Sequence, residues 1–384
     1  MIRSYKFRLY PTMQQVKALN DTIETCRHLY NDSLGERSAD WEIGYWEQQN
    51  LLTLRKQDNK YYKQVHSQVL QDVLQGLDKS YQAFFKKIAK YPKFKRKEKY
   101  SSFTYPQYGG FKLEDGKLKL SHVGSIKIRM HRIPVGRLKR CTIIRDVDQW
   151  FCCITAADGA EQEQLKSDKA IGIDMGLLNW MTLSNGDSVR NPMNIEARTS
   201  RIKKLQRRLS RKEKYSHNRE KARTLLAREW RNLRRRRDDF CHKESKKLAD
   251  KYDTIVFEKL NITGMVRNHH LAKAIMEATW GKLRLYTAYK VERLGGQVIL
   301  VNPNGTSQKC SKCGLGATKR LDLSIRTFEC QSCSLVIDRD HNAAMNILKL
   351  GLEQARAEER PILIRQRISK FASRKQEAHI SRNG

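Results

Sequence analysis

Residues 171–176 read Ile-Gly-Ile-Asp-Met-Gly, a short apolar run that is interrupted by the acid Asp174. A second apolar run, Ile-Val-Phe-Glu at 255–258, closes on Glu258. Both runs have the length and the apolar content of buried strands. Because a carboxylate in or at the end of a core strand costs free energy unless it pairs or coordinates a cation, both acids are candidates for a functional site.

Helical stretches separate and follow these two runs. Beyond 169 the sequence predicts strands and long basic helices, then the strand at 254–258, a helix at 271–295, a strand at 297–303 and a helix at 341–350. Strands that alternate with helices are typical of an α/β domain. A chain of 384 residues has room for this domain and for further modules.

A third acid lies at the start of the last predicted helix, in the stretch DRDHNAA at 338–344. If folding gathers Asp174, Glu258 and Asp340, their oxygens form a site suited to Mg²⁺, which binds a few carboxylates and completes its octahedron with water and phosphate. Two such ions, roughly 3.5–4 Å apart, can activate water and stabilise the leaving oxygen at a phosphodiester. The three acids therefore predict a nuclease.

Each acid also has a structural explanation. Asp174 can be a turn acid, Glu258 can pair with Lys259, and either Asp338 or Asp340 can cap the helix that follows. As an ordered trio in a strongly basic chain, the acids fit a metal site better than these three separate roles.

Four of the nine cysteines follow the pattern C-x2-C-x16-C-x2-C, namely Cys310, Cys313, Cys330 and Cys333. This spacing is typical of a zinc ribbon, in which two tight turns present four thiolates to Zn²⁺. Four thiolates complete the tetrahedral coordination, so we expect a structural Zn²⁺ whose binding energy folds the intervening loop. The odd total and the scatter of the other cysteines argue against a secreted disulfide framework.

The charge of the chain points to a polyanionic partner. It contains 76 Lys and Arg against 41 Asp and Glu, a formal net charge of +35. Cations that neutralise phosphates release condensed counterions, which supplies affinity for nucleic acid. Anionic membranes are the alternative, but no apolar run approaches the roughly 20 residues of a transmembrane helix and the N-terminus has no apolar secretory core. We expect a cytoplasmic, nucleoid-associated prokaryotic protein.

A large part of the excess charge lies in 201–247, where 20 Lys and Arg face 6 Asp and Glu. Leucines and Trp230 recur among these cations, so one helical face can pack while the others meet phosphate. A solvated helical hairpin is the alternative, but a basic run with so few acids repels itself unless a polyanion is present. The residues that we expect to contact nucleic acid are Arg207, Arg208, Arg211, Lys212, Arg234, Arg235 and Arg236.

The first part of the chain has a different pattern. Residues 1–10 alternate like a strand, and Thr12 with Gln15 has the spacing of a capping box that starts a helix running to about Leu34. A second helical stretch covers roughly 45–90. Short alternating strands with glycine turns follow from 101 to about 157, which predicts a barrel or sheet with the helices inserted into it.

Five stretches, in order and spacing, resemble the RuvC-like nuclease and zinc ribbon of the TnpB or OrfB family of transposon proteins: GIDMG at 172–176, VFEKLNITGM at 256–265, TSQKCSKCG at 306–314, FECQSC at 328–333 and DRDHNAAMNI at 338–347. The beginning, YKFRLYPTMQQ at 5–15 and CRHLYNDSL at 26–34, also looks like the entry to that family. The resemblance therefore covers nearly the whole chain, and about 40–160 matches only in general texture.

The resemblance implies an α/β RNase H-like (RuvC) nuclease domain with an inserted zinc ribbon, and an N-terminal wedge β-barrel carrying a helical recognition insertion. We expect the following bounds: 1–10 and 91–168 for the wedge, 11–90 for the recognition insertion, 169–303 and 336–350 for the nuclease, 304–335 for the zinc ribbon, and 351–384 for a basic C-terminal tail.

The resemblance also implies RNA-guided DNA cleavage. The partners would be a guide RNA from the transposon end and a double-stranded DNA target with a short flanking motif, as in related type V CRISPR effectors. The cofactors would be structural Zn²⁺ and catalytic Mg²⁺ or Mn²⁺. Its acids fall on Asp174, Glu258 and Asp340, the last preferred to Asp338 because it directly precedes the x-Asn-Ala-Ala segment.

Two other functions are compatible with the same residues. One is a catalytically silent, RNA-guided DNA-binding regulator, against which the intact acidic trio argues. The other is a RuvC-like nuclease that acts without a guide on RNA or branched DNA. Loss of targeting after ribonuclease treatment would distinguish the guided enzyme from the second alternative.

Overall fold

The structure is a computed structural model that describes residues 2–157, 169–190, 195–316 and 325–357. The chain divides into two compact units, Met1–Glu161 with Arg211–Arg231 and Gln162–Ser210 with Asn232–Gly384. The predicted linker at 158–168 and the part of the predicted tail beyond 357 lie outside the described residues. No helix within the described ranges is both long and apolar enough to cross a membrane.

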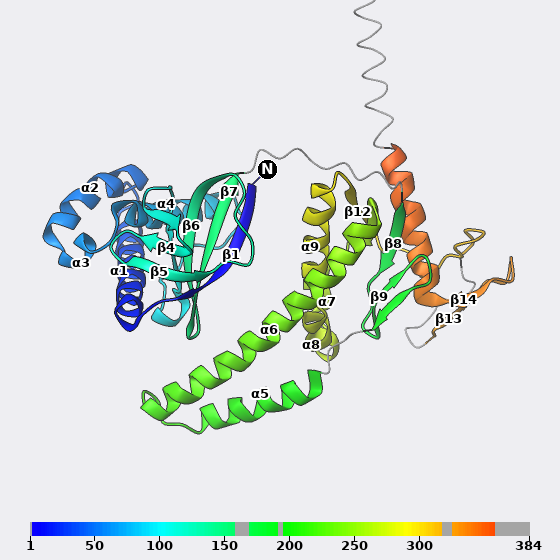
Figure 1. The fold of residues 1–384 in the computed structure, drawn as a ribbon. Coiled ribbons are helices and arrows are strands. Elements are labelled where there is room, and N and C mark those ends of the chain that lie inside the picture. The colour runs from blue at the N-terminus through cyan, green and yellow to red at the C-terminus, as the bar shows by residue number, and fades with distance from the viewer. Residues whose placement is uncertain (1, 158–168, 191–194, 317–324, 358–384) are drawn as a thin grey trace, which may run out of the picture. The chain divides into compact units, whose positions relative to one another are not determined.

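The first unit contains a seven-stranded antiparallel sheet (Figure 1). Its strand order is β2-β6-β7-β1-β5-β4-β3. The bounds are β1 (Ile2–Tyr10), β2 (Ser102–Tyr105), β3 (Phe111–Glu114), β4 (Lys117–Leu120), β5 (Gly124–Arg129), β6 (Arg137–Asp146) and β7 (Gln149–Ala157). A closed barrel would need β2 to pair with β3, whereas the observed order ends at these two strands, so the predicted barrel is an open sheet in its hydrogen bonding.

Helices enter this unit between β1 and β2. They are α1 (Met13–Ala39), α2 (Tyr45–Asp58), α3 (Lys60–Lys63) and α4 (Ser67–Phe85), followed by the short 3-10 helix η1 (Lys97–Lys99). The predicted capping box is confirmed: the backbone N–H of Thr12 donates to Gln15 Oε1 (3.0 Å), and the N–H of Gln15 donates to Thr12 Oγ1 (3.4 Å). Apolar residues of α1 and α4 form one core with the inward side chains of β1, such as Phe7.

The second unit contains a five-stranded mixed sheet in the order β10-β9-β8-β11-β12. The bounds are β8 (Ala170–Asp174), β9 (Asn179–Leu183), β10 (Ser188–Arg190), β11 (Thr254–Glu258) and β12 (Gln297–Val301). Strands β8, β11 and β12 run parallel, while β9 pairs antiparallel with both β8 and β10. The predicted strands at 171–176 and 254–258 thus lie side by side in the α/β arrangement that the sequence predicts.

Helices cover both faces of this sheet. The helices that follow β10 in the chain are α5 (Ile195–Ser210), α6 (His217–Lys251), α7 (Ile262–Met265), α8 (His269–Ala278), α9 (Trp280–Arg293) and a last helix at 339–357. Residues of α6, α8 and α9 share one core with β8, β9 and β11. On the other face, Val256 and Ile299 pack with Ile347 of the last helix. Figure 1 shows this helix in orange beside β8.

The helices differ from the prediction in two places. The predicted helix at 271–295 is two helices, because Thr279 adopts a left-handed backbone conformation (φ 55°) that ends α8. The indole N–H of Trp180 donates to the carbonyl of Ala278 at this break (2.5 Å). The last helix continues beyond 350 through 357, and Gly351 lies directly against the buried Val256.

Candidate active site and cysteine centre

Two of the predicted acids lie at the same edge of the second sheet. Asp174 is the last residue of β8 and Glu258 is the last residue of β11. The two strands are parallel and in register, with Ile173 opposite Phe257. Carboxyl ends of parallel strands are the usual location of ligand sites in α/β sheets. The parallel direction and the register of these strands therefore bring the two carboxylates together from positions far apart in the sequence.

The third acid is carried by the last helix, which approaches β8 very closely. A Cβ added to Gly172 would lie 2.3 Å from the carbonyl oxygen of Ala344 and 2.6 Å from the nitrogen of Leu348. Only a glycine allows the helix backbone to come this near the strand. The contact sets Asp340, in the first turn of the helix, beside the end of β8.

The electrostatics of Asp174 report on its neighbours. Burial, together with the charges of Glu258 and Asp340, raises the pKa of Asp174 to about 8. Burial also raises the pKa of Glu258, and burial with the charge of Asp338 raises the pKa of Asp340. A divalent cation at this position would relieve the repulsion, so the residues fit such an ion.

The alternative roles of Asp338 and Asp340 separate in the structure. Asp338 Oδ1 accepts from the backbone N–H groups of Asp340 (2.9 Å) and His341 (3.0 Å), which is an N-cap bond. Asp338 is exposed, whereas Asp340 is half-buried and raises the pKa of Asp174. The capping role thus belongs to Asp338, whereas Asp340 is the acid whose charge acts on Asp174.

Three residues that the sequence did not predict, Thr306, Asn342 and Asn346, connect Glu258 with the last helix through the start of the cysteine loop. Thr306 Oγ1 donates to Glu258 Oε1 at 2.6 Å. Asn346 Nδ2 donates to the carbonyl oxygens of Thr306 and Lys309, each at 2.8 Å. Asn342 Nδ2 donates to the carbonyl of Lys309 at 2.7 Å. The spacing of four between the two asparagines places them on one helix face and was the available signal.

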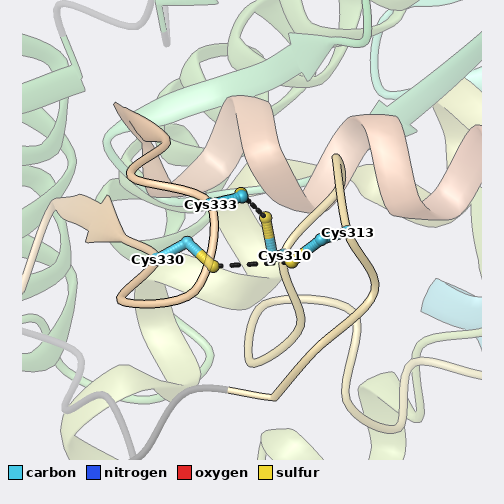
Figure 2. A group of neighbouring side chains, drawn as sticks. All are labelled: Cys310, Cys313, Cys330 and Cys333. Carbon is cyan, nitrogen blue, oxygen red and sulfur yellow. Dashed lines mark hydrogen bonds between the residues drawn. The ribbon is translucent and has the colours of Figure 1, made fainter.

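The four predicted cysteines come together around one point, as Figure 2 shows. Their Sγ atoms all lie within 4.8 Å of one another, and the separations Cys310–Cys333 and Cys313–Cys330 are 3.5 Å. A tetrahedral ion with Zn–S bonds of about 2.3 Å would hold its sulfurs about 3.8 Å apart, so the donor set fits Zn²⁺. The backbone N–H of Cys333, first among several contacts, lowers the pKa of Cys330 to about 6, which favours the thiolate.

Two short strands support this cysteine centre. The strands β13 (Thr327–Glu329) and β14 (Val336–Asp338) pair antiparallel, and Phe328 is buried beside Cys310 and Cys330. In the part of the chain that the structure describes, the cysteines are the one group of three or more potential ligands that meets the 4.8 Å spacing. The charges of Glu258 and Asp340 act on Asp174, but the oxygen atoms of these three carboxylates do not meet the 4.8 Å spacing.

The predicted nucleic-acid contacts lie on α5, on α6 and in the turn between these helices. Arg207, Arg208, Arg211, Arg234 and Arg236 are exposed, while Lys212 and Arg235 are half-buried. Not every cation of the run is available to a partner. Arg228 pairs with Asp148 at 3.0 Å, and the buried Arg231 also pairs with Asp148. Part of the basic run therefore serves the protein's own packing.

Three family profiles match the chain. Residues 151–269 match the OrfB_IS605 family, described as "Probable transposase". Residues 280–347 match the "Cas12f1-like, TNB domain", and residues 1–44 match a "Helix-turn-helix domain". Over this last range the structure has β1 followed by the single continuous helix α1.

Two relatives align over most of their length. A "Putative RNA-guided DNA endonuclease" of Streptomyces pristinaespiralis is 34% identical, covering 91% of this chain and 89% of the relative. "Putative RNA-guided DNA endonuclease InsQ" of Escherichia coli (strain K12) is 30% identical, covering 91% of this chain and 92% of the relative. The solved structure of the "mini-RNA-guided endonuclease CRISPR-Cas_phi3" overlaps with a TM-score of 0.48 at 11% identity, covering 91% of this chain and 92% of the other.

Proposed function

The chain belongs to the TnpB (OrfB) family of RNA-guided DNA endonucleases, and on that premise we propose which of its residues cut DNA. The cutting site consists of Asp174, Glu258 and Asp340, in an RNase H-like (RuvC) domain formed by 169–303 and 336–350. The observation that carries this proposal is the meeting of Asp174 and Glu258 at the ends of adjacent parallel strands, where the charges of Glu258 and Asp340 raise the pKa of Asp174.

The three carboxylates would hold Mg²⁺ or Mn²⁺. Two such ions supply activation of the attacking water and stabilisation of the leaving oxygen. The chain's own contribution is to present the carboxylates from three segments on rigid elements, partly screened from water, where charge interactions are strong. Asp338 contributes indirectly, since its cap fixes the first turn of the helix that carries Asp340.

The cysteine centre would hold one structural Zn²⁺ within a zinc ribbon at 304–335. Four thiolates leave no open coordination position, so this metal takes no part in hydrolysis. The wedge, at 1–10 and 91–168, and the recognition helices, at 11–90, would serve the guide RNA and the target with its flanking motif. Base pairing with a guide from the transposon end would then select the DNA.

Phosphate contacts from α5 and α6 would position nucleic acid without reading its sequence. Arg207, Arg208 and Arg211 present their charges at the end of α5, and Arg234 and Arg236 are exposed on α6. Lys212 and Arg235 belong to the same proposed set. The net charge of +35 on the whole chain supports this assignment.

The test is cleavage of a DNA target by protein purified with its RNA, in Mg²⁺. We expect Asp174→Ala to abolish cleavage while guide and target binding persist. Asp340→Asn should do the same, whereas Asp338→Asn should retain cleavage because asparagine also caps helices well. Equal cleavage by Asp174→Ala, or loss with Asp338→Asn but not Asp340→Asn, would refute the site. Cleavage that survives ribonuclease treatment would instead favour a guide-independent nuclease.

A further inference from the structure

The carboxylate of Glu258 is buried and held by one hydroxyl. Glu258 is 7% exposed and Thr306 is 4% exposed. The bond from Thr306 Oγ1 to Glu258 Oε1 measures 2.6 Å, in the range of a hydroxyl that donates to a charged acceptor. Thr306 Oγ1 also lies 3.1 Å from the carbonyl oxygen of Pro303, but a hydroxyl has a single proton and a carboxylate is the stronger acceptor.

Thr306 is itself fixed from the opposite side by the last helix. Asn346 donates to the carbonyl of Thr306 and, through the same nitrogen, to the carbonyl of Lys309. One turn earlier, Asn342 donates to Lys309 and accepts from the backbone N–H of Ser311 at 2.9 Å. The segment of the chain that enters the cysteine centre is therefore bound to the helix at two successive turns.

These contacts form one continuous connection between two of the proposed metal-binding acids. It runs from Glu258 through the Thr306 hydroxyl, along the 306–311 segment, to Asn342 and Asn346, and so to the helix whose first turn carries Asp340. Every polar link in it is a hydrogen bond of 2.6–2.9 Å. A hydroxyl in this position limits the rotation of the Glu258 carboxylate, because rotating it would leave buried oxygen atoms without their partner.

We infer that Thr306 is a positioning residue: its hydroxyl orients the Glu258 carboxylate toward a divalent cation, and Asn346 holds Thr306 in register with the helix of Asp340. The inference rests on the proposed function, since it gives Glu258 the role of metal ligand. Hydrogen-bond partners that orient metal ligands commonly alter metal affinity or activity by roughly 10–100-fold when they are removed.

The decisive comparison is Thr306→Val against Thr306→Ser, in the full chain with its RNA. Valine keeps the shape and removes the hydroxyl, while serine keeps the hydroxyl. We expect Thr306→Val to need roughly 10–100-fold more Mg²⁺ for half-maximal single-turnover cleavage, and Thr306→Ser to stay near wild type. Asn346→Ala should shift the Mg²⁺ dependence in the same direction, with Met345→Ala, an exposed position on the same helix, as the control.

A second measurement does not depend on DNA cleavage. Fe²⁺ with ascorbate can replace Mg²⁺ and cut the polypeptide near its binding site, so protein fragments ending near 174, 258 and 340 report occupancy. We expect these fragments to weaken in Thr306→Val and to return in Thr306→Ser. If wild type fails to cut DNA but shows this pattern, the proposed function is wrong and the positioning role stands.

The inference is overturned if Thr306→Val matches wild type in both measurements. It is also overturned if Thr306→Ser is as impaired as Thr306→Val, because the hydroxyl would then not be the cause. Should Thr306→Val fail to fold, the Asn346→Ala and Thr306→Ser results decide in its place, and an unshifted Mg²⁺ dependence in Asn346→Ala counts against the connection.

Discussion

Burial and two neighbouring charges all raise the pKa of Asp174. The side chain ends an apolar strand and faces Glu258 and Asp340, so its ionised form is disfavoured and its pKa rises to about 8. Such clustering destabilises a protein in which nothing neutralises the acids. It also supports the proposed metal site, since clustered acids with a raised pKa are typical of functional sites.

The raised pKa of Asp174 predicts that the stability of the protein depends on pH. The folded pKa of about 8 exceeds the unfolded value of about 3.9, so the associated stability is present below about pH 4 and is lost as the pH rises through about 8. Without Mg²⁺ but with Zn²⁺ retained, we expect Asp174→Asn to have a higher Tm than wild type at about pH 9. Thermal unfolding followed by circular dichroism checks this, and parallel pH profiles for the two proteins would contradict it.

Among the elements, the last helix does most to assemble the site. Gly172 lets it lie against β8, and Gly351 lets it lie against Val256 of β11. Because the same helix carries Asp340, Asn342 and Asn346, its distance from the sheet decides where the side chains of the proposed site lie. The close packing at Gly172 and Gly351 therefore fixes where Asp340 lies relative to the sheet.

We therefore expect Gly172→Ala to destabilise the protein and reduce cleavage. The added Cβ would meet backbone atoms at 2.3 and 2.6 Å, which can be relieved only by moving the helix, and overpacking of this kind costs typically 1–3 kcal/mol. Gly76→Ala in α4 is the matched control: nothing lies within 4 Å of its added Cβ, and alanine favours a helix. Chemical denaturation of both variants decides the point, and equal midpoints would exclude the close contact.

The cysteine centre gives a second prediction for an element. We expect about one Zn²⁺ per chain, lost in Cys310→Ser and kept in Cys153→Ser, whose thiol lies in the first unit. Because Lys309 and Ser311 flank Cys310 and bind the last helix, zinc loss should also reduce cleavage without abolishing guide binding. Zinc content by mass spectrometry and cleavage by the same preparations are the measurements. Full cleavage activity in a zinc-free variant would show that the carboxylate site does not depend on the cysteine centre.

For the whole molecule, the excess positive charge predicts how binding depends on salt. Changing Arg207, Arg208 and Arg211 together to glutamine should weaken nucleic-acid binding and flatten the plot of log affinity against log salt by about 0.7–0.9 per lost phosphate contact. Arg228→Gln is the control, since this side chain already pairs with Asp148. Filter binding at several salt concentrations tests this, and an unchanged slope in the triple variant would remove these arginines from the interface.

Local patterns were sufficient for much of this molecule. The capping box at Thr12, the strands that end in Asp174 and Glu258, and the cysteine spacing depend on neighbours within a few residues, where backbone geometry leaves few alternatives. The break at Thr279 was not predicted; there the indole N–H of Trp180, 98 positions away in the chain, donates to the Ala278 carbonyl.

Long-range packing decided the rest. Asp338 and Asp340 are the same residue type and two residues apart, and only the direction of the last helix against β8 makes one a cap and the other a neighbour of Asp174. The local pattern around Thr306 does not indicate a contact with Glu258, because their bond joins residues 48 positions apart. Residue type and short spacing therefore specify which chemistry the chain carries, whereas the three-dimensional contact of separate segments specifies which atoms perform it, because hydrogen bonds and charge interactions act over a few ångströms of space and not along the chain.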